Sequence, residues 1–506
     1  MRVLNTEEIK SADKKTIDSG QISALDLMEK AACACLPYIF KELAWRSQLL
    51  IFCGNGNNGA DGLVIARHVA QTGKEVIIVS DDDDQNKSQL FLTNKARLVG
   101  YDAVHFVTFE ILNSTVFLSG DLLIVDAIFG TGLRSAVKGD FIHWISWINQ
   151  KNATVISIDM PSGCPGDAVF SDEKNPVAVR ASMTLTFQFP RLSSFISLWR
   201  AFMGNIIFLP VGLLEPEVFE DNYFFVDRNF ACSLVWDRNQ SFHKGNFGHL
   251  FLAAGSSLYT GAAILACGGA LRSGVGLVSA FVPASVKTTL NIACPEAIVR
   301  CSEDNLFLSG TPRINDYSAV AVGPGITKAD SCTLLLKYII GECRLPLLLD
   351  ADALNILSEN PTWLAFLPPK TILTPHPKEF ERLVGKVKEG PETWSALRAF
   401  AAKWDLVVVL KGRNSMIATP NRNIYFNGSG NAGMAKGGSG DVLSGIIGGL
   451  LAQGYLPEHA AILGTHIHGV AGDFAASDQG QHGMTPQSIV HYLDKAWLNL
   501  KTSSII

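Results

Sequence analysis

The chain has 506 residues, of which 47% are hydrophobic and 18% are charged, and this length and composition predict a globular protein with two domains. A net charge of −5 without a long basic stripe argues against a nucleic-acid-binding protein. The sequence shows no long apolar span and no secretory leader, and its 10 cysteines have no CxxC or zinc-type spacing. We therefore expect a cytoplasmic protein with reduced thiols and no membrane partner.

Short apolar segments alternate with amphipathic ones over the first part of the chain. Strands are expected at 48–54, 75–80, 122–130, 153–163, 182–190 and 205–213, with a helix at 62–73. Short apolar strands separated by helices are typical of a parallel sheet that is covered on both faces.

The pattern breaks at 214–230, which places a domain boundary near residue 222. In the second part, strands are expected within the segments 248–257, 317–325, 345–357, 370–385 and 405–412. The two halves share no close internal repeat. The sequence thus predicts two different three-layer α/β domains in tandem, residues 1–222 and 223–506.

A glycine-rich motif, GNGNNGADG, follows the first expected strand at 54–62. It contains G-x-G-x-x-G, and Asp81 follows the next strand, as in the dinucleotide-binding fingerprint. This motif alone leaves a Rossmann-type dehydrogenase open. However, Asn57, Asn58 and Asp61 supply polar side chains that a bare pyrophosphate turn does not need.

Two later strands of the first half end on acids, Asp126 and Asp159. Ligands of a parallel sheet bind at the carboxyl ends of its strands, so Asn58 and Ser162 can converge with these acids. Oxygen ligands without sulfur or imidazole suit a hard cation. Alternatively, each acid caps the helix that follows it. For either acid alone both interpretations are open, whereas the whole set favours a site.

Four motifs in order, TIDSGQISALDLMEKA, GNGNNGADG, VDAIFGTGL and IDMPSG, resemble the YjeF N-terminal domain of NAD(P)H-hydrate epimerases over residues 1–215. The resemblance implies a Rossmann-like fold in which Asp159 contacts the hydrated nicotinamide ring and handles its proton. It also implies that Asn58, Asp126 and Ser162 bind a potassium ion. The residues that would cradle the nucleotide are Asn57, Asn58, Gly59, Ala60, Asp61, Gly130, Thr131, Gly132, Leu133, Arg134, Ser135 and Ala136.

Two departures from that family pattern are visible. The usual second glycine before Asp61 is Ala60, and the segment CPGDAVFSDEKN at 164–175 differs from the usual run. A methyl group at Ala60 would crowd a close backbone approach, so weakened epimerase activity is one expectation.

The second half carries GGSGD at 437–441, which leads into a helix with one apolar stripe. The free N–H groups of residues 437–440 would face an anion, although a turn for tight packing is the alternative. The chain has no G-x-x-x-x-G-K-[ST] motif, so this is not a P-loop. Asp441 lies where an acid can accept the proton of a hydroxyl that attacks a phosphoryl group. In this respect GGSGD resembles the ribokinase-like superfamily, where such an aspartate is the base.

Further motifs narrow this resemblance. HKGNFGHLFLAAGS, VGPG, LLDADALNIL, LTPHPKEFERLVG, VVLKG and GNAGMAKGGSGDVLSG together resemble the NAD(P)H-hydrate dehydratase family over residues 236–490. The resemblance implies dehydration driven by ADP or ATP with Mg²⁺, and Asp441 as the base that touches the substrate. The hydrated nucleotide would contact Ala262, Gly325, His376, Pro377, Lys378, Glu379, Phe380, Glu381, Arg382 and Asp441. ADP would contact Lys411, Gly412, Arg413, Asn414, Ser415, Asn431, Ala432, Gly433, Met434, Ala435, Lys436, Gly437, Gly438, Ser439 and Gly440.

Several residues of this half admit a second interpretation. His376, between two prolines, also suits a plain turn. Asp350 and Asp352 either order Mg²⁺ or waters, or cap the helix that begins near residue 353. His466 and His468 are two residues apart and cannot share a helix face, which indicates packing or surface positions.

The two resemblances together imply a bifunctional repair enzyme for NADHX and NADPHX, the hydrated forms of NADH and NADPH. Its epimerase would interconvert the R and S epimers, and its dehydratase would convert the S epimer to NAD(P)H at the expense of ADP or ATP. A homo-oligomer is expected because family members often assemble. A ribokinase-like small-molecule kinase with a regulatory N-terminal domain and a non-catalytic nucleotide sensor are the alternatives.

Overall fold

The computed structural model describes residues 1–114, 121–167, 176–217, 219 and 222–501. The chain forms two compact units, one of residues Arg2–Asp221 and the other of Asn222–Ile506 together with Met1. No described helix is both long enough and apolar enough to cross a membrane.

The N-terminal unit is built on a seven-stranded sheet in the order β3-β2-β1-β4-β5-β6-β7, in which every neighbouring pair is parallel. The strands are β1 (Gln48–Cys53), β2 (Val76–Val79), β3 (Val104–Val107), β4 (Leu122–Ala127), β5 (Thr154–Ile158), β6 (Met183–Phe187) and β7 (Asn205–Leu209). The strand order reverses between β1 and β4, so the crevice for a ligand is expected where these two strands end.

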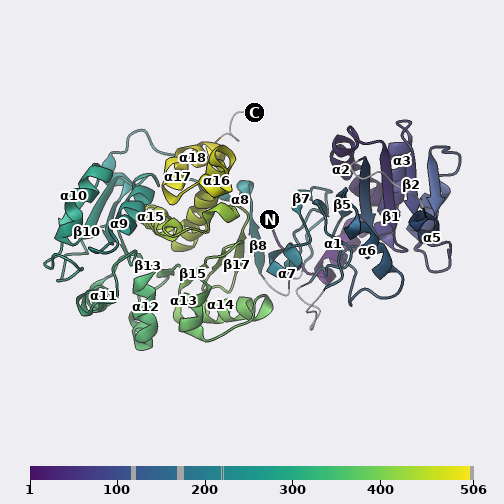
Figure 1. The fold of residues 1–506 in the computed structure, drawn as a ribbon. Coiled ribbons are helices and arrows are strands. Elements are labelled where there is room, and N and C mark those ends of the chain that lie inside the picture. The colour runs from purple at the N-terminus through teal and green to yellow at the C-terminus, as the bar shows by residue number, and fades with distance from the viewer. Residues whose placement is uncertain (115–120, 168–175, 218, 220–221, 502–506) are drawn as a thin grey trace. The chain divides into compact units, whose positions relative to one another are not determined.

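Helices cover both faces of this sheet (Figure 1). They are α1 (Thr6–Asp18), α2 (Ala24–Leu43), α3 (Asn57–Ala70), α4 (Gln89–Ala96), α5 (Phe109–Asn113), α6 (Phe141–Gln150) and α7 (Ser197–Arg200). Successive side chains of β1 face opposite layers of helices. Ile51 packs in a cluster with α2 and α3, whereas Phe52 packs with Trp144 of α6. The predicted parallel sheet with two covered faces is confirmed.

The C-terminal unit contains a ten-stranded sheet in the order β11-β10-β9-β12-β13-β14-β15-β16-β17-β8. The strands are β8 (Tyr223–Val226), β9 (His249–Ala253), β10 (Leu277–Val282), β11 (Ile298–Cys301), β12 (Ala319–Val322), β13 (Leu347–Leu349), β14 (Ile372–Leu373), β15 (Val407–Leu410), β16 (Met416–Ala418) and β17 (Ile424–Asn427). The strands from β11 to β15 are parallel, and β16 pairs antiparallel with both of its neighbours. The order reverses between β9 and β12, which again marks a ligand crevice.

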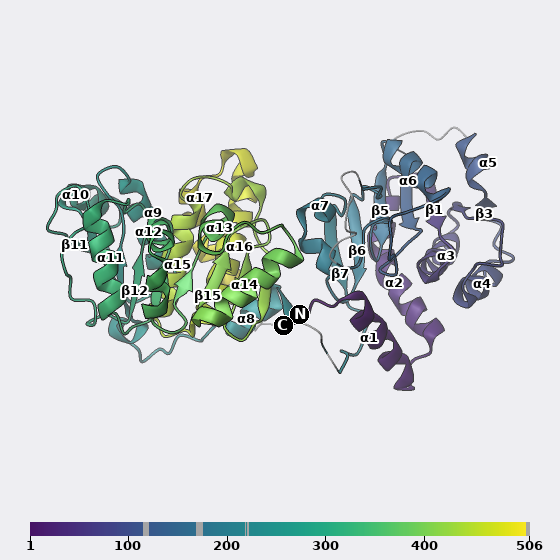
Figure 2. The ribbon, with the colours of Figure 1, turned by 90° about the horizontal axis from the view of Figure 1, so that it is seen from below.

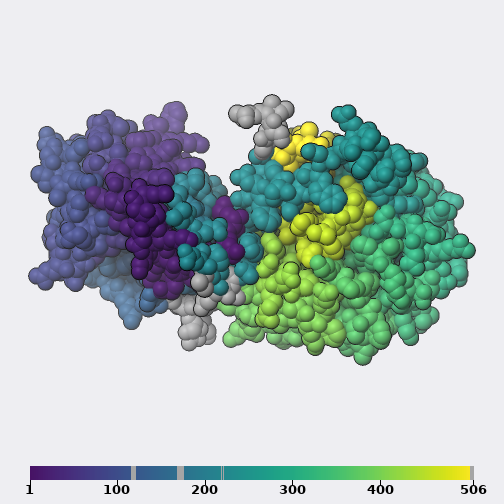
Figure 3. Space-filling model, turned by 180° about the vertical axis from the view of Figure 1, so that it is seen from behind, coloured from purple at the N-terminus to yellow at the C-terminus, as the bar shows by residue number. Residues whose placement is uncertain are grey.

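Helices also lie on both sides of this second sheet (Figures 1 and 2). They are α8 (Arg228–Leu234), α9 (Thr260–Leu271), α10 (Ala284–Ala293), α11 (Asp330–Glu342), α12 (Asp352–Glu359), α13 (Pro377–Val384), α14 (Pro391–Trp404), α15 (Ser439–Ala452), α16 (Pro457–Gly483), α17 (Pro486–His491) and α18 (Leu493–Lys501). The apolar stripe predicted after GGSGD is the buried face of α15, and it packs with α9 and α16 in one core cluster. The end of α18 lies beside α8 (Figure 3), where the Arg228 side chain donates to the Asn499 carbonyl at 2.8 Å.

Candidate active sites

The glycine turn after β1 brings three segments of backbone close together. A Cβ at Gly54 would lie 2.0 Å from the Ile128 carbonyl oxygen, and a Cβ at Gly59 would lie 1.9 Å from the Gly54 oxygen. Only glycine fits these two positions. Helix α3 begins at Asn57, five residues before the expected start at 62, so residues 57–61 form its first turn rather than a loop.

Ala60, where the family pattern has glycine, is buried in the cluster of α2, α3 and the sheet. Its methyl group therefore packs into the core. This position offers no reason for weakened activity through crowding. The other departure, segment 164–175, lies outside the described residues from position 168 onward.

Asp159 is the centre of a buried polar group at the end of β5. Its backbone is left-handed, with φ 64°, and the residue is 8% exposed. One carboxylate oxygen accepts hydrogen bonds from the Thr131 hydroxyl and, at 2.8 Å, from the Thr131 amide. The other accepts from Arg191 Nη2 at 2.6 Å, and Arg191 Nε reaches the Thr131 hydroxyl at 3.0 Å.

These contacts decide the ionisation of Asp159. Burial alone would raise the pKa of this carboxyl, but the Arg191 charge and the hydrogen bonds from Thr131 hold it below its usual range. Two neighbouring acids behave in the opposite way. Burial, with the charge of Asp159, raises the pKa of Asp61 well above its usual value, and burial raises that of Asp13 to about 6.

Asp126 forms a second buried group at the same edge. Its carboxylate accepts from Ser157 Oγ at 2.7 Å, from both the amide and the hydroxyl of Ser162, and from the Ile128 amide at 3.3 Å. Burial raises the pKa of Asp126. The interpretation as helix caps is wrong for both acids, because Asp126 and Asp159 bind loop residues and neither is the N-cap of a helix.

Asn58 and Gly130 complete this edge. A Cβ at Gly130 would lie 2.8 Å from an Asp159 carboxylate oxygen and 3.4 Å from the Asn58 amide carbon, so Asn58 lies near Asp159. The Asn58 Nδ2 atom is buried and has no hydrogen-bond partner among the described residues. In the following loop, Thr131 is buried, Leu133 and Ala136 are half-buried, and Gly132, Arg134 and Ser135 are exposed.

The carboxyl edge of the second sheet gathers residues from several strand ends. Ala262 lies at the start of α9, after β9, and Gly325 follows β12. A Cβ at Gly325, which has φ 64°, would lie 2.7 Å from the Ala262 Cβ, so the structure brings these two predicted residues together.

Lys411 anchors an ion pair at this edge. Its Nζ atom donates to Asp350 Oδ1 at 2.7 Å and lies 4.0 Å from Glu379 Oε2. The second Asp350 oxygen accepts from Ser444 Oγ of α15. Desolvation would lower the pKa of Lys411, but Asp350 and Glu379 raise it, so the ammonium stays charged.

The capping interpretation of Asp350 and Asp352 is also wrong. Helix α12 has no side-chain cap, and Asp352 Oδ2 instead accepts from the Thr327 amide at 2.9 Å. Asp350 is 1% exposed and serves the Lys411 ion pair.

Asp441 lies in the first turn of α15, next to Gly440. A Cβ at Gly440 would lie 3.3 Å from Lys411 Nζ. Burial and the nearby charges of Asp350 and Asp352 raise the pKa of Asp441 to about 7, against an opposing effect of Lys411. A base is most effective when its pKa lies near the working pH.

The glycine-rich segment before Asp441 agrees only in part with the expected anion cradle. A Cβ at Gly437 would have no neighbour within 4 Å, so this backbone has space in front of it. The Ser439 amide is not free, because it donates to the Lys436 carbonyl at 3.3 Å. The Lys436 side chain itself donates to carbonyls at the end of α16, including that of His482 at 2.8 Å.

A residue of α16 forms a hydrogen bond with Asn431, which in turn binds a neighbouring amide. Asn431 Nδ2 donates to Asp473 at 2.9 Å, and Asn431 Oδ1 accepts from the Gly433 amide at 3.0 Å. In the other expected ADP-binding segment, Gly412 and Arg413 are exposed, Ser415 is half-buried, and Asn414 donates to the Asn427 carbonyl at 2.9 Å.

Residues 376–382 form the start of α13 rather than a plain turn. His376 is the N-cap, with a capping box in which its Nδ1 accepts from the Glu379 amide and Glu379 accepts from the His376 amide. Phe380 is 1% exposed and packs edge-on against Phe400, so it faces the core and not a ligand. Pro377, Lys378, Glu381 and Arg382 are exposed.

His466 and His468 are both buried on α16, so packing positions are confirmed and surface positions are wrong. Burial lowers the pKa of each ring to about 4, and both are therefore neutral at pH 7.

Sequence reasoning missed Arg191, Asp13 and Ser444. Arg191 is 2% exposed although it is an arginine. One signal was available, because Arg191 comes directly after an apolar strand, at the edge where the acids lie.

The comparisons with known proteins cover both units. A family model described as YjeF-related protein N-terminus matches residues 24–193, and one described as NAD(P)H-hydrate dehydratase matches residues 250–495. Among solved structures, an ADP/ATP-dependent NAD(P)H-hydrate dehydratase from Bacillus subtilis is 29% identical, with a TM-score of 0.48, and covers 55% of this chain and 99% of its own.

Full-length relatives are also similar. A bifunctional NAD(P)H-hydrate repair enzyme from Moorella thermoacetica is 32% identical over 99% of this chain and 97% of its own. Those from Thermofilum pendens and Escherichia coli are 33% and 30% identical, over 98% and 97% of this chain and 96% and 92% of their own. Both units, in the same order and over nearly the whole length, are thus matched, and the chain belongs to the family of bifunctional NAD(P)H-hydrate repair enzymes.

Proposed function

We propose that the N-terminal unit interconverts the R and S epimers of hydrated NADH and NADPH, and that the C-terminal unit dehydrates the S epimer with ADP or ATP. The observation that carries this proposal is the pair of acids at the carboxyl edges of the two sheets. Asp159 is held ionised, whereas Asp441 has a pKa of about 7. Each lies among the residues that its own family motif assigns to a substrate.

In the epimerase, Asp159 would accept a proton from the hydrated ring. An ionised carboxylate that accepts from Arg191 and Thr131 is already oriented for this task. Asp61 and Asp13 lie within its electrostatic reach and have raised pKa values, so a protonated acid is available to return a proton. The nucleotide would extend along residues 57–61 and 130–136.

A potassium ion at this edge is supported by the oxygen-rich set of Asn58, Asp126 and Ser162. The buried Nδ2 atom of Asn58 has no partner among the described residues, and rotating the amide would present its oxygen instead. Asp126 already accepts four hydrogen bonds. We infer that Asn58 and Ser162 would face the ion, whereas Asp126 would supply negative charge behind them.

In the dehydratase, the hydroxyl oxygen of the hydrated ring would attack the terminal phosphoryl group of ADP or ATP, while Asp441 accepts the hydroxyl proton. The C–O bond to the new phosphate then breaks, and loss of a proton from the adjacent carbon restores the ring double bond. The products are NAD(P)H, inorganic phosphate and AMP or ADP. Water is thereby removed without leaving a phosphorylated metabolite.

Different residues around Asp441 would bind the phosphates of ADP or ATP and the hydrated nucleotide. Lys411 and the backbone of Gly437, Gly438 and Gly440 would hold the phosphates, with Mg²⁺ bound largely through phosphate oxygens and water, as this ion prefers. Ala262, Gly325 and His376 would border the hydrated nucleotide. The Phe380 side chain packs against Phe400 and would not face this ligand.

The test is to incubate the purified chain with mixed hydrate epimers and Mg²⁺, with ADP or with ATP. We expect complete recovery of the near-ultraviolet absorbance of reduced nicotinamide and release of one phosphate per NAD(P)H. A stable phosphorylated product without NAD(P)H recovery would instead identify a small-molecule kinase.

Two further expectations belong to this proposal. The 10 free cysteines are consistent with a reducing, cytoplasmic setting. We also infer a homo-oligomer, which the molar mass from light scattering would test.

A further inference from the structure

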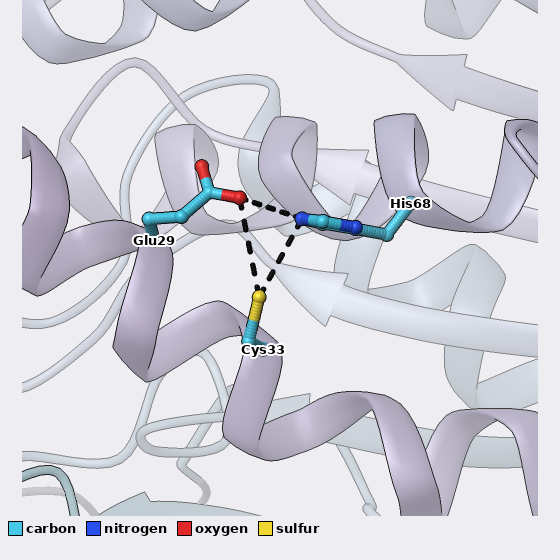
Figure 4. Close-up of side chains that lie close together, drawn as sticks. All are labelled: Glu29, Cys33 and His68. Carbon is cyan, nitrogen blue, oxygen red and sulfur yellow. Dashed lines mark hydrogen bonds and ion pairs between the residues drawn. The ribbon is translucent and has the colours of Figure 1, made fainter.

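Three metal-ligating side chains meet between two helices of the N-terminal unit. Glu29 and Cys33 lie one turn apart on α2, and His68 lies in the last turn of α3 (Figure 4). His68 Nε2 is 2.6 Å from Glu29 Oε1 and 3.5 Å from Cys33 Sγ, and the sulfur is 3.9 Å from the same Glu29 oxygen. All three side chains are half-buried.

The arrangement does not fit a catalytic Cys–His–acid relay. In such a relay the acid binds one ring nitrogen and the nucleophile the other. Here the Glu29 oxygen and the Cys33 sulfur both approach Nε2, so the three atoms converge on one point. Convergence of this kind is typical of ligands around an ion.

The distances are close to those of a tetrahedral zinc site. Ordinary Zn–S, Zn–N and Zn–O bonds place sulfur about 3.6 Å from nitrogen or oxygen, and nitrogen about 3.3 Å from oxygen. Both sulfur distances in the structure lie within about 0.3 Å of this value. Only the short contact between Glu29 and His68 would have to lengthen as an ion replaces the hydrogen bond.

We propose that Glu29, Cys33 and His68 bind a zinc ion, with a water molecule in the fourth position. A thiolate, an imidazole and a carboxylate are the ligands that zinc prefers, and magnesium or calcium would not select the sulfur. The ion would join the end of α3 to α2. Since α3 begins with residues 57–61, we infer that the site stabilises the helix that carries the nucleotide turn.

Neighbouring charges influence the affinity of this site for zinc. Arg67 Nη2 donates to both Glu29 oxygens, and Arg97 lies 3.8 Å from one of them, so two positive groups oppose a cation. Burial, together with the Glu29 charge, raises the pKa of the Cys33 thiol. Zinc must therefore displace the thiol proton, and its affinity is expected to increase with pH.

The experiment uses the full chain after reduction and removal of metals with a chelator, and Co²⁺ as a spectroscopic probe. We expect one Co²⁺ per chain, with a thiolate-to-cobalt absorption band that Zn²⁺ abolishes, and a higher melting temperature with Zn²⁺. Cys33→Ser should lose the band, whereas the exposed Cys301→Ser should keep it. His68→Gln, which retains the thiol, should weaken binding by about tenfold or more.

The proposal is overturned if the wild-type chain shows no thiolate band, or if the band survives both Cys33→Ser and His68→Gln. Binding is measured without substrate or nucleotide, so its outcome is independent of the two proposed activities.

Discussion

The two proposed active sites place their acids in opposite electrostatic surroundings. Asp159 has an arginine within hydrogen-bond distance, and its pKa is lowered in spite of burial. Asp441 is half-buried, has two other aspartates nearby, and finds the lysine of its site already paired with Asp350, so its pKa is raised to about 7. The pKa of a buried carboxyl therefore depends on whether the nearest cation is directed at it or at another acid.

The largest expected effect comes from removing either acid. Asp441→Asn should lower the rate of dehydration by about 10²–10⁴-fold, because the attacking hydroxyl loses its base. Epimerisation and ADP binding should be retained, since neither needs the Asp441 charge. The rates are measured by NAD(P)H recovery and by separation of the epimers, and ADP binding by calorimetry. Loss of both activities would indicate a folding defect or a shared site.

A smaller effect is expected from the arginine that distinguishes the first site. Arg191→Met removes the charge that lowers the pKa of Asp159, so this pKa should increase. Asp159 is active when ionised, so the midpoint of the epimerase pH profile should move to higher pH. Arg191→Lys is the matched control and should restore part of the shift. An unchanged profile in Arg191→Met would show that Arg191 is only structural.

At the second site, removing a neighbouring charge should lower the pH midpoint of activity instead of raising it. Asp350→Asn keeps the shape of the side chain but removes a negative charge that raises the pKa of Asp441. The pH midpoint of dehydration should fall by up to about one unit. Asp352→Asn should shift it in the same direction but less, because its influence is the weaker of the two. A shift to higher pH would contradict this view of the site.

The smallest effect concerns stability. The pKa of Asp441 is raised in the folded state, so its contribution is favourable below the unfolded value of about 4 and is lost as the pH rises through about 7. The Asp441→Asn substitution should therefore change the melting temperature more favourably at pH 8 than at pH 5, by about a few degrees. Scanning calorimetry at the two pH values checks this. An equal effect at both would refute the raised pKa.

Much of the fold was predictable because apolar strands and glycine turns have strong local signatures. The segment 48–73 indicated a strand, a tight turn and a helix, and the structure has all three. The start of α3 was placed too late because Asn57 and Asn58 resemble loop residues in sequence. In the structure both residues belong to the first turn of α3, and Gly59 in that turn lies directly against the Gly54 backbone.

The partners within the sites were less predictable. Asp126, Asp159, Asp350 and Asp441 were recognised as candidate acids, but for the first three capping was a reasonable alternative because strand ends often precede helices. Only the folded chain shows that Arg191, 32 residues after Asp159, donates to it. The Glu29, Cys33 and His68 group was also missed, since its members come from two helices with no motif between them.

The central claim is that the dehydratase site acts on the S epimer alone and that the separate epimerase site converts the R epimer to it. The most direct test supplies purified R and S hydrates separately, with ADP and Mg²⁺, to the wild-type chain and to Asp159→Asn. The wild-type chain should recover NAD(P)H from both epimers, whereas Asp159→Asn should recover it from the S epimer alone. Equal recovery from both epimers by Asp159→Asn, or from neither, would contradict the account.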